Sequence, residues 1–356
     1  MITDFSAMTV TSDATLRDAI AAIDAGARQL AVVVDAGGRL VGTVSDGDIR
    51  RGLLRGVSLD ATITEVVNTT PTIASVGQSM ADVLKDADST NIHLVPVVDG
   101  SQVVVGLLSD SEKVEVEPLT TPVVLMAGGK GVRLHPLTFN VPKPMLTIGE
   151  TPIIEIILRK LHAQGFRKIF ISVNYLAEII EEHVKDGSWL GLDVTYVHED
   201  KPMGTAGALG QLKDELTESF LVMNGDLLTN CDLSDAVRSH NKSGASATLC
   251  VREYSFQIPY GVVNVEGNIV ESISEKPTHS SLVSAGIYVL DPSALDLVPE
   301  NSYFDMPSLL TAISDNGSPV VAFPVFESWL DIGRHDDLED ARSNVGDWLD
   351  GTTVRK

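Results

Sequence analysis

Cysteine and long apolar runs are both scarce in this sequence. The chain has two cysteines, Cys231 and Cys250, too few for a zinc-binding pattern or a disulfide framework. No apolar run approaches the roughly 18 residues that a membrane-spanning helix needs. The first residues, Met1 to Asp4, also lack the basic and then apolar pattern of a secretory signal peptide. We therefore expect a cytoplasmic protein that does not contact a membrane.

Basic residues are also few. The 356 residues include 26 Lys and Arg against 49 Asp and Glu, which gives a formal net charge of −23. Residues 1–118 hold 17 acidic and 8 basic residues, and the remainder holds 32 and 18, so no basic domain is hidden by averaging. We do not expect nucleic-acid binding. A polyanionic substrate would have to be met by a few local cations and a divalent metal ion.

The first third of the chain contains an internal repeat. Five features recur at one shared offset of 64 residues, which is hard to obtain by chance. The matching pairs are Val33-Val34-Asp35 with Val97-Val98-Asp99, Gly42 with Gly106, Ser45-Asp46 with Ser109-Asp110, Thr15 with Ser79, and Asp18 with Asp82. We interpret them as two copies of one unit, about residues 1–58 and 59–118. Neither copy can bury much core by itself, so the two should pack together.

Both copies show the same order of predicted elements. A helix is expected over residues 16–25 and again over 80–87. Two strands follow in each copy, at 30–34 and 40–44 and at 93–98 and 103–108, joined by glycine-containing turns. Another helix is expected to begin near Ser45 and near Ser109. The charged, proline-containing residues 113–121 then indicate a boundary, which assigns residues 1–118 to one domain and 119–356 to another.

Residues 42–48 and 106–112 resemble segments of a tandem pair of CBS domains, and the resemblance covers roughly residues 1–115. In that family a Ser or Thr and an Asp three residues later hold the phosphate and ribose of an adenine nucleotide. Ser45 and Asp48 match this pattern, whereas Ser109 is followed by Glu112 in place of Asp. The resemblance implies a sensor of AMP or ATP, or a dimerisation module. A simpler interpretation is that Ser45 and its neighbour cap a helix.

From residue 122 onward, predicted strands and helices alternate. The expected strands are 123–126, 168–173, 193–198, 220–224 and 247–252, and the expected helices are 153–164, 176–185, 206–215 and 233–243. This order is typical of a mostly parallel α/β sheet, in which ligands bind at the carboxyl ends of the strands. Residues 128–133, Asn174 and residues 225–226 follow such strand ends.

The loop after the first of these strands is suited to an anion. Gly128, Gly129 and Gly131 fall within four positions, Lys130 lies among them, and Arg133 follows. Glycines let backbone N–H groups come close to a phosphate, and basic side chains neutralise it. The spacing matches neither a Walker A loop nor the G-x-G-x-x-G of dinucleotide sites. A plain tight turn between a strand and a helix is the alternative.

Two carboxylates are candidate ligands for Mg²⁺. Asp226 follows the expected strand 220–224, and Asp331 ends an apolar segment. Oxygen ligands suit Mg²⁺, which usually takes one or two carboxylates and completes its shell with phosphates and water. A capping or turn Asp is the alternative. Small residues at 204–208 would let a base or a sugar approach the backbone, although tight packing of a helix on a sheet explains them equally well.

Taken together, eight segments resemble the motifs of the sugar-1-phosphate nucleotidyltransferases, in that family's order, over residues 122–345. They are residues 128–134, 142–145, 204–208, 224–226, 260–263, 275–277, 284–288 and 329–333. The resemblance implies a Rossmann-like catalytic core that joins a nucleoside triphosphate to a sugar 1-phosphate and releases pyrophosphate. Val132 and Ser284 depart from the family's usual Thr and Asn. No hexapeptide repeats follow the core, so we do not expect the bifunctional acetyltransferase type.

The resemblance also implies roles for individual residues. Arg133 would hold the triphosphate and stabilise the departing pyrophosphate, and Lys143 would contact the α-phosphate. Asp226 and Asp331 would bind Mg²⁺, and Lys276 would hold the phosphate of the sugar. Further substrate contacts are expected from Ala127, Gly128, Gly129, Gly204, Thr205, Gly207, Asn224, Tyr260, Gly261 and Glu275, the last of these with sugar hydroxyls. The attacking phosphate oxygen is already ionised, so the in-line displacement needs no general base.

The fusion to a CBS pair is most similar to mannose-1-phosphate guanylyltransferase-like enzymes. It favours GTP and the 1-phosphate of mannose or an amino sugar. A dTTP- or UTP-dependent glucose-1-phosphate transferase is the alternative. A third interpretation is a non-catalytic regulatory subunit, but loss of catalysis should first remove Arg133, Lys143, Asp226 or Asp331, and all four are present. We also expect a homo-oligomer.

Overall fold

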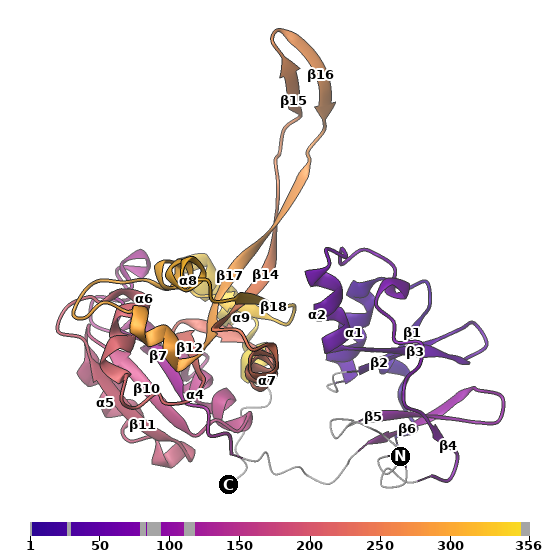
Figure 1. The fold of residues 1–356 in the computed structure, drawn as a ribbon, viewed down its shortest axis with the longest axis horizontal. Coiled ribbons are helices and arrows are strands. Elements are labelled where there is room, and N and C mark those ends of the chain that lie inside the picture. The colour runs from indigo at the N-terminus through magenta and orange to yellow at the C-terminus, as the bar shows by residue number, and fades with distance from the viewer. Residues whose placement is uncertain (1, 27–29, 79–82, 84–93, 110–117, 350–356) are drawn as a thin grey trace. The chain divides into compact units, whose positions relative to one another are not determined.

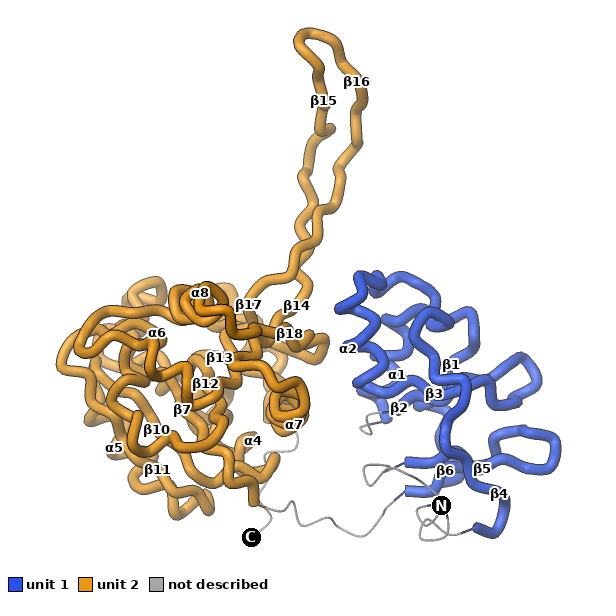
Figure 2. Tube along the Cα trace, viewed as in Figure 1, with its two compact units in different colours: residues 1–115 blue, residues 116–356 orange. Residues whose placement is uncertain are grey.

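The computed structural model divides into two compact units, residues 1–115 and 116–356 (Figure 2). It describes residues 2–26, 30–78, 83, 94–109 and 118–349. The helix expected over 80–87 and the one expected after Ser109 fall largely outside these ranges. No helix within the described ranges is both long and apolar enough to cross a bilayer.

The N-terminal unit contains two small sheets that repeat one another. The first has the order β1-β2-β3, with β1 (Thr9–Thr11), β2 (Leu30–Val34) and β3 (Leu40–Ser45), and is accompanied by α1 (Leu16–Gly26) and α2 (Asp46–Leu54). The second has the order β4-β5-β6, with β4 (Ala74–Ser75), β5 (Leu94–Val98) and β6 (Val104–Ser109). Val33 pairs with Gly42, and Val97 pairs with Gly106. The register therefore repeats at the same offset of 64 residues as the sequence.

The two sheets of this unit share one core. Val32 and Val34 of the first copy pack in a cluster with Val98, Val104 and Leu107 of the second. Backbone hydrogen bonds also join the copies, from Leu40 N to Gln102 O at 2.9 Å and from Val104 N to Gly38 O at 3.1 Å. Burying apolar surface between the copies gives each of them a core that its own length could not supply.

The C-terminal unit is built on a seven-stranded sheet of order β11-β10-β7-β12-β17-β14-β18 (Figure 1). β17 runs antiparallel to both of its neighbours, and the remaining pairs are parallel, which confirms a mostly parallel sheet. The order reverses between β7 and β12, and in such sheets ligands bind beyond the carboxyl ends of the strands at this point. The strands are β7 (Val123–Met126), β10 (Lys168–Val173), β11 (Asp193–His198), β12 (Phe220–Asn224), β14 (Ala247–Gln257), β17 (Thr278–Leu290) and β18 (Val320–Pro324).

Successive residues of a strand point to opposite faces of its sheet, so both faces of this sheet carry apolar side chains. Helices cover both of these faces. Val123 and Leu125 belong to one buried cluster and Val124 to the other. Residues of α4 (Ile153–Ala163), α5 (Ala177–Val184), α7 (Leu233–Ser243), α9 (His335–Ser343) and α10 (Val345–Leu349) contribute to the first cluster. Residues of α6 (Gly204–Gly207) and α8 (Met306–Asp315) contribute to the second.

One predicted helix differs from the structure. The helix expected over 206–215 is instead the single turn α6 followed by a 3-10 helix at Ala208–Leu212. Gly207 and Gly210 fall inside this segment, and glycine is a poor helix former, so the sequence favours short turns over a regular helix.

Two short antiparallel pairs lie beside the large sheet. β8 (Thr147–Ile148) pairs with β9 (Thr151–Pro152), directly before α4. β13 (Leu227–Thr229) pairs with β19 (Trp329–Asp331), so that Leu227 lies opposite Asp331. This second pair joins segments that are far apart in the chain and positions Asp331 next to the end of β12.

A long two-stranded ribbon projects from the large sheet (Figure 1). Its lower part is formed by the ends of β14 and β17, and its far part by β15 (Val262–Glu266) and β16 (Ile269–Ser274). We call residues 251–284 the arm. The sequence predicted a strand over 247–252 only, so the continuation of β14 to Gln257 and the other three strands of the hairpins were missed.

Candidate active site

The glycine-rich loop lies directly after β7, at the carboxyl edge of the sheet. Gly131 has a positive φ of 61° and begins a 3-10 turn over Val132–Leu134. Thr138 Oγ1 donates a hydrogen bond of 2.8 Å to the Gly131 carbonyl. A Cβ at Gly131 would lie 3.2 Å from Cβ of Lys143. The loop is thus fixed against the segment that carries Lys143, while Gly129 and Lys130 stay exposed.

The turn after β12 touches the same loop. Gly225 N donates to Met126 O at 2.9 Å. A Cβ at Gly225 would lie 2.9 Å from that carbonyl oxygen and 3.4 Å from Cα of Ala127. Because those atoms belong to the backbone and cannot move aside, only glycine fits, and this close approach places Asp226 beside the end of β7.

Lys143, Asp226 and Asp331 form one cluster. Lys143 Nζ donates to Asp226 Oδ2, and lies 3.9 Å from Asp331 Oδ1. Ile332 N also donates to Asp226 O at 3.2 Å. Three segments that are distant in sequence are therefore held together by the contact of Gly131 with Lys143, by the close approach at Gly225 and by the β13–β19 pair.

The electrostatics of this cluster suit a cation. Burial raises the pKa of the Asp331 carboxyl, and the charge of Asp226 raises it further, while Lys143 and Arg133 oppose the shift. Asp226 Oδ1 is buried and has no hydrogen-bond partner within the described residues. An oxygen atom of this kind is costly to bury unless a donor or a cation meets it.

The two carboxylates suit Mg²⁺, which takes only part of its coordination shell from protein, better than a metal ion whose ligands all come from protein side chains. Asp226 and Asp331 offer hard oxygen ligands, and the described ranges contain no group of three or more His, Cys, Asp or Glu that could hold a metal. Mg²⁺ commonly binds through one or two carboxylates and completes its shell with substrate phosphates and water.

Arg133 borders the cluster from the glycine-rich loop. Its Nη1 lies 3.5 Å from the position that a Cβ on Gly333 would take, just after Asp331. The side chain is exposed, and its charge lowers the pKa of Asp331. A guanidinium at this position is free to approach an anion that enters above the loop.

Glu199, which follows β11 at the same edge, is a site residue that was not predicted from the sequence. Its Oε1 accepts a hydrogen bond of 2.6 Å from Ser172 Oγ, and its Oε2 accepts one of 2.9 Å from Met203 N. A Cβ on Gly128 would lie 2.7 Å from Oε1. Glu199 is therefore a pre-oriented, half-buried carboxylate beside the glycine-rich loop. Its position after a strand of the parallel sheet was the signal that could have identified it.

The family model for nucleotidyl transferases matches residues 122–347, which hold the sheet and this cluster. The chain belongs to the nucleotidyl transferase family. A CBS domain model matches residues 1–55.

Three proteins illustrate what this nucleotidyl transferase resembles. A UTP–glucose-1-phosphate uridylyltransferase of Synechocystis is 32% identical over 242 residues, which cover 62% of each chain. A mannose-1-phosphate guanylyltransferase of Mycobacterium tuberculosis is 30% identical over 226 residues, which cover 60% of this chain and 62% of the relative. The chain thus spans about 62% of the length of these curated relatives. A crystal structure from Bacillus anthracis, assigned to the glucose-1-phosphate thymidylyltransferases, aligns with a TM-score of 0.52 and 25% identity, over 63% of this chain and 94% of that one.

The segment of small residues at 204–207 packs tightly in this nucleotidyl transferase. Ala206 N and Gly207 N both donate to Phe304 O at 3.0 Å. A Cβ would lie 2.5 Å from that oxygen at Gly204, and 2.7 Å from Ser302 O at Gly207. Thr205 Oγ1 accepts from Met306 N at 2.9 Å, at the start of α8. Close packing therefore accounts for these small residues, and contact with the nucleoside stays a prediction.

Four predicted substrate contacts lie on the arm, and the structure does not bring them to the cluster. Tyr260 is 75% exposed, and Gly261, Glu275 and Lys276 lie with it where the lower ribbon meets the far hairpin. Lys276 has a positive φ of 46°, which is uncommon for a residue with a side chain.

Asn224, by contrast, lies at the site. A Cβ on Gly286, at the base of the arm, would be 2.8 Å from Asn224 Nδ2. The base of the arm therefore borders the carboxyl edge of the sheet, although the predicted substrate contacts on the arm do not reach the Lys143 cluster.

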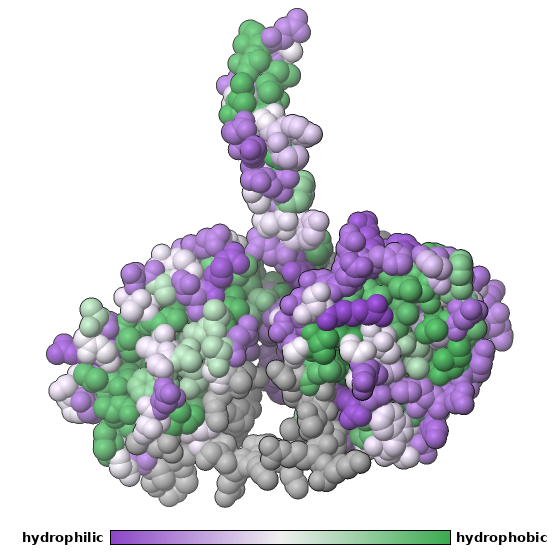
Figure 3. Space-filling model, turned by 180° about the vertical axis from the view of Figure 1, so that it is seen from behind, coloured by the Kyte–Doolittle hydropathy of each residue, from purple (hydrophilic) through white to green (hydrophobic). Residues whose placement is uncertain are grey.

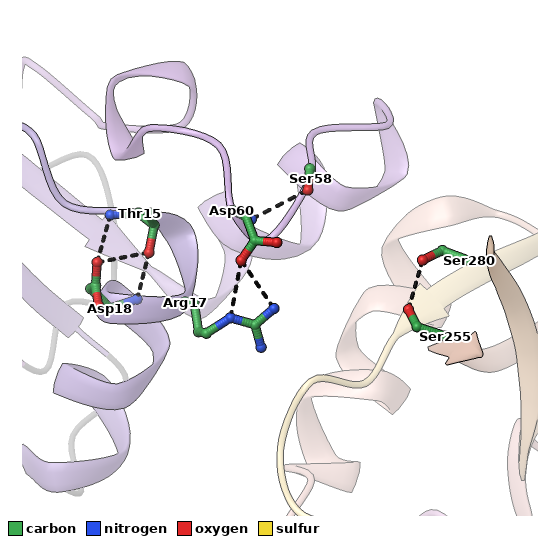
Figure 4. Close-up of polar contacts among 7 residues, drawn as sticks. All are labelled: Thr15, Arg17, Asp18, Ser58, Asp60, Ser255 and Ser280. Atoms are coloured by element: carbon green, nitrogen blue, oxygen red, sulfur yellow. Dashed lines mark hydrogen bonds and ion pairs between the residues drawn. The ribbon is translucent and has the colours of Figure 1, made fainter. Parts of the chain in front are cut away.

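Two of the three predicted nucleotide-binding residues of the N-terminal unit, Ser45 and Asp48, cap a helix. Ser45 Oγ donates to Asp48 Oδ2 at 2.7 Å and accepts from Asp48 N at 3.3 Å at the start of α2. Thr15 and Asp18 form the equivalent reciprocal pair at the start of α1 (Figure 4). Ser109 ends β6 in the second copy. Capping accounts for Ser45 and Asp48 without a ligand, so nucleotide binding stays a prediction.

Proposed function

We propose that the chain transfers a guanylyl group from GTP to a sugar 1-phosphate, of mannose or an amino sugar, and releases pyrophosphate. The observation that carries this proposal is the meeting of a glycine-rich loop, Lys143 and two carboxylates at the point where the strand order of the sheet reverses. Phosphates bind well where backbone N–H groups and cations converge at such a position.

Asp226 and Asp331 are the proposed holders of Mg²⁺. Family members generally use a divalent metal ion. The buried Asp226 Oδ1 without a partner supports the assignment. When bound, Mg²⁺ would supply charge neutralisation for the triphosphate.

The chain's own residues then perform positioning and charge stabilisation. Lys143, which pairs with Asp226, would turn toward the α-phosphate. Arg133, exposed at the mouth of the loop, holds the triphosphate and stabilises the departing pyrophosphate. The attacking oxygen belongs to the sugar phosphate and is already ionised, so no residue has to remove a proton.

Glu199 supports the choice of guanine over uracil or thymine. Each of its oxygens already accepts one hydrogen bond and has a lone pair left for a second. The Watson–Crick edge of guanine offers two adjacent N–H donors, which match a carboxylate in bidentate fashion. Uracil and thymine offer one N–H between two carbonyl oxygens, which a carboxylate repels. A UTP- or dTTP-dependent glucose-1-phosphate transferase is the alternative, and relatives of those types are known.

Lys276 and Glu275 are proposed to bind the sugar phosphate and the sugar hydroxyls. In the cluster of Lys143, Asp226 and Asp331, the charges of the two carboxylates offset those of Lys143 and the neighbouring Arg133. Little positive charge is therefore left to bind a second phosphate group. A further cation is required, and Lys276 is the proposed source.

The N-terminal unit is proposed to bind AMP or ATP at Ser45 and Asp48. CBS domains generally bind adenine nucleotides, and one CBS model matches this unit. A purely dimerising role is the alternative.

The decisive experiment is a grid of pyrophosphate-release assays with Mg²⁺. It crosses GTP, dTTP, UTP, CTP and ATP with the 1-phosphates of mannose, glucose, glucosamine and N-acetylglucosamine. We expect turnover with GTP and one sugar, abolished by EDTA. Asp226→Asn should reduce it by about 100-fold or more, whereas Asp193→Asn, on the exposed surface of β11, should not. If a folded protein released no pyrophosphate with any pair of substrates, the regulatory-subunit alternative would be favoured.

A further inference from the structure

The arm is an amphipathic ribbon whose apolar face is uncovered. In its lower part, Tyr254 and Phe256 share one face with His279, which stacks on Phe256 with a centroid distance of 5.6 Å. The opposite face carries Ser255 and Ser280, whose hydroxyls lie 2.6 Å apart (Figure 4). One face of the ribbon is therefore aromatic, and the other is polar apart from Leu282, which lies opposite Glu253.

The far hairpin repeats this division. Val263 lies opposite Ile273, and Val265 lies opposite Val270, all on one face. The other face carries Asn264, which donates to Ser272 Oγ at 2.9 Å, and it also carries Ile269, which lies opposite Glu266. The four apolar side chains of the first face are 48–65% exposed. The space-filling view shows hydrophobic residues gathered near the far end of the arm (Figure 3).

A ribbon of this kind requires a partner. An isolated pair of strands is marginally stable in water, and a sheet face of aromatic and β-branched residues is stabilised by being covered. Contiguous exposed apolar surface of this type marks an interaction site. The carboxylates Glu253 and Glu266 lie on the polar faces, since they alternate with the apolar residues. Two strongly acidic molecules could therefore meet at the apolar face without opposing these charges.

The length of the arm decides whether Lys276 can contact the site of its own chain. Seven residue pairs, from Val251 with Ser284 to Gln257 with Thr278, follow without a register shift. At about 3.3 Å per residue, this ladder carries Lys276 roughly 20 Å beyond the edge of the sheet. The base of the arm borders the chain's own site at Asn224. Rotation about that base would keep Lys276 at the same distance, so the intact ribbon cannot deliver Lys276 to its own site.

We infer that the arm docks on a second copy of this chain and brings Lys276 to the catalytic site of that copy, in a reciprocal twofold dimer. The role of Lys276 in catalysis rests on the proposed function, whereas the docking of the arm does not. Each copy would then supply the loop, Lys143 and the carboxylates of one site, and the additional cation of the other.

The first test does not depend on activity. Sedimentation should show a dimer, and Phe256→Ser should raise its dissociation constant by at least 10-fold, whereas Ser280→Ala, on the polar face, should leave it unchanged. A chain with Lys276→Cys and Lys130→Cys, joined by a short bis-maleimide, should give a covalent dimer on a denaturing gel. A monomer in solution, or a cross-linked product of single-chain mass, would overturn the inference.

The second test uses differently tagged, co-expressed chains. A dimer of Asp226→Asn with Lys276→Met contains one complete site if the arm acts on its partner, so about half of the wild-type turnover should return. A dimer of wild type with the Asp226→Asn/Lys276→Met double variant should then be inactive. The reverse pattern would show that each arm serves its own site. If wild type is silent with every substrate pair, the proposed function fails, and the cross-link still decides where the arm docks.

Discussion

At the scale of the residue, Glu199 is the side chain that we propose to contact the base of the nucleotide. Replacement by Gln keeps its size but removes the second acceptor that a guanine edge would use. We expect Glu199→Gln to lower kcat/KM for GTP by about 10- to 100-fold, the worth of one bidentate contact. The measurement is the ratio of kcat/KM for GTP to that for UTP. Asp200→Asn, at the exposed neighbouring position, should leave this ratio unchanged; an unchanged ratio in Glu199→Gln itself would refute the base assignment.

Gly225 is the second residue whose surroundings dictate its identity. A Cβ there would lie 2.9 Å from Met126 O, which is fixed in the parallel ladder. We expect Gly225→Ala to lower the free energy of unfolding by about 1–3 kcal/mol, the usual cost of overpacking. Gly129→Ala is the matched control, because nothing lies within 4 Å of a Cβ at that position. Urea unfolding of both variants tests this, and equal midpoints would contradict the steric argument.

At the scale of elements, α7 is joined to β14 through a buried histidine. His240 Nδ1 lies 2.9 Å from Thr248 Oγ1, and burial lowers the pKa of its imidazole. As the pH falls below about 6.5, the imidazole of His240 binds a proton more readily in the unfolded chain than in the folded one. The free energy of unfolding therefore declines from pH 7 toward pH 5.

The expected result is that His240→Gln loses less stability than wild type between pH 7 and pH 5, as measured by urea midpoints. His198→Gln, at an exposed position on β11, should follow the wild-type curve. If the urea midpoints of His240→Gln fell with pH as those of wild type do, another group would be responsible for the loss of stability below pH 7.

Local patterns predicted single elements well and long-range pairings poorly. β10, β11, β12 and α7 begin and end at the predicted residues, because each is a short apolar or amphipathic segment bounded by turn residues. The arm was missed because its strands are exposed on both faces and carry no buried pattern beyond Val251. A regular helix was wrongly predicted at α6 because its glycines are required by close contacts with Ser302 and Phe304, about 100 residues away in the chain.

The same division holds for the site. Asp226 and Asp331 could be proposed from their positions after apolar segments, but their contact with Lys143 depends on the β13–β19 pair, which no local pattern reveals. Likewise, no local pattern could show that Lys276 projects away from the sheet, because its place is decided by an uninterrupted ladder of strand pairs.

At the scale of the whole molecule, the question is whether the N-terminal unit senses a nucleotide. Ser45 and Asp48 satisfy each other at the start of α2, and Asp48 also pairs with Arg51. An anion arriving at this helix start would meet backbone N–H groups and Arg51, while Asp48 could turn to ribose hydroxyls. The same two residues can thus cap the helix when it is empty and bind a ligand when one is present.

We therefore expect AMP or ATP to raise the melting temperature of the N-terminal unit, because a ligand that binds only the folded state stabilises it by about 2.7 kcal/mol at 100 times its Kd. Asp48→Asn should abolish the shift, since the amide keeps the size of the side chain and loses its charge. Asp18→Asn, at the equivalent helix start, is the matched control for capping alone. A shift that survives in Asp48→Asn would place the nucleotide elsewhere, and no shift in wild type would leave this unit a dimerisation module. A change in turnover on adding the nucleotide to wild type, and not to Asp48→Asn, would connect the two units in function.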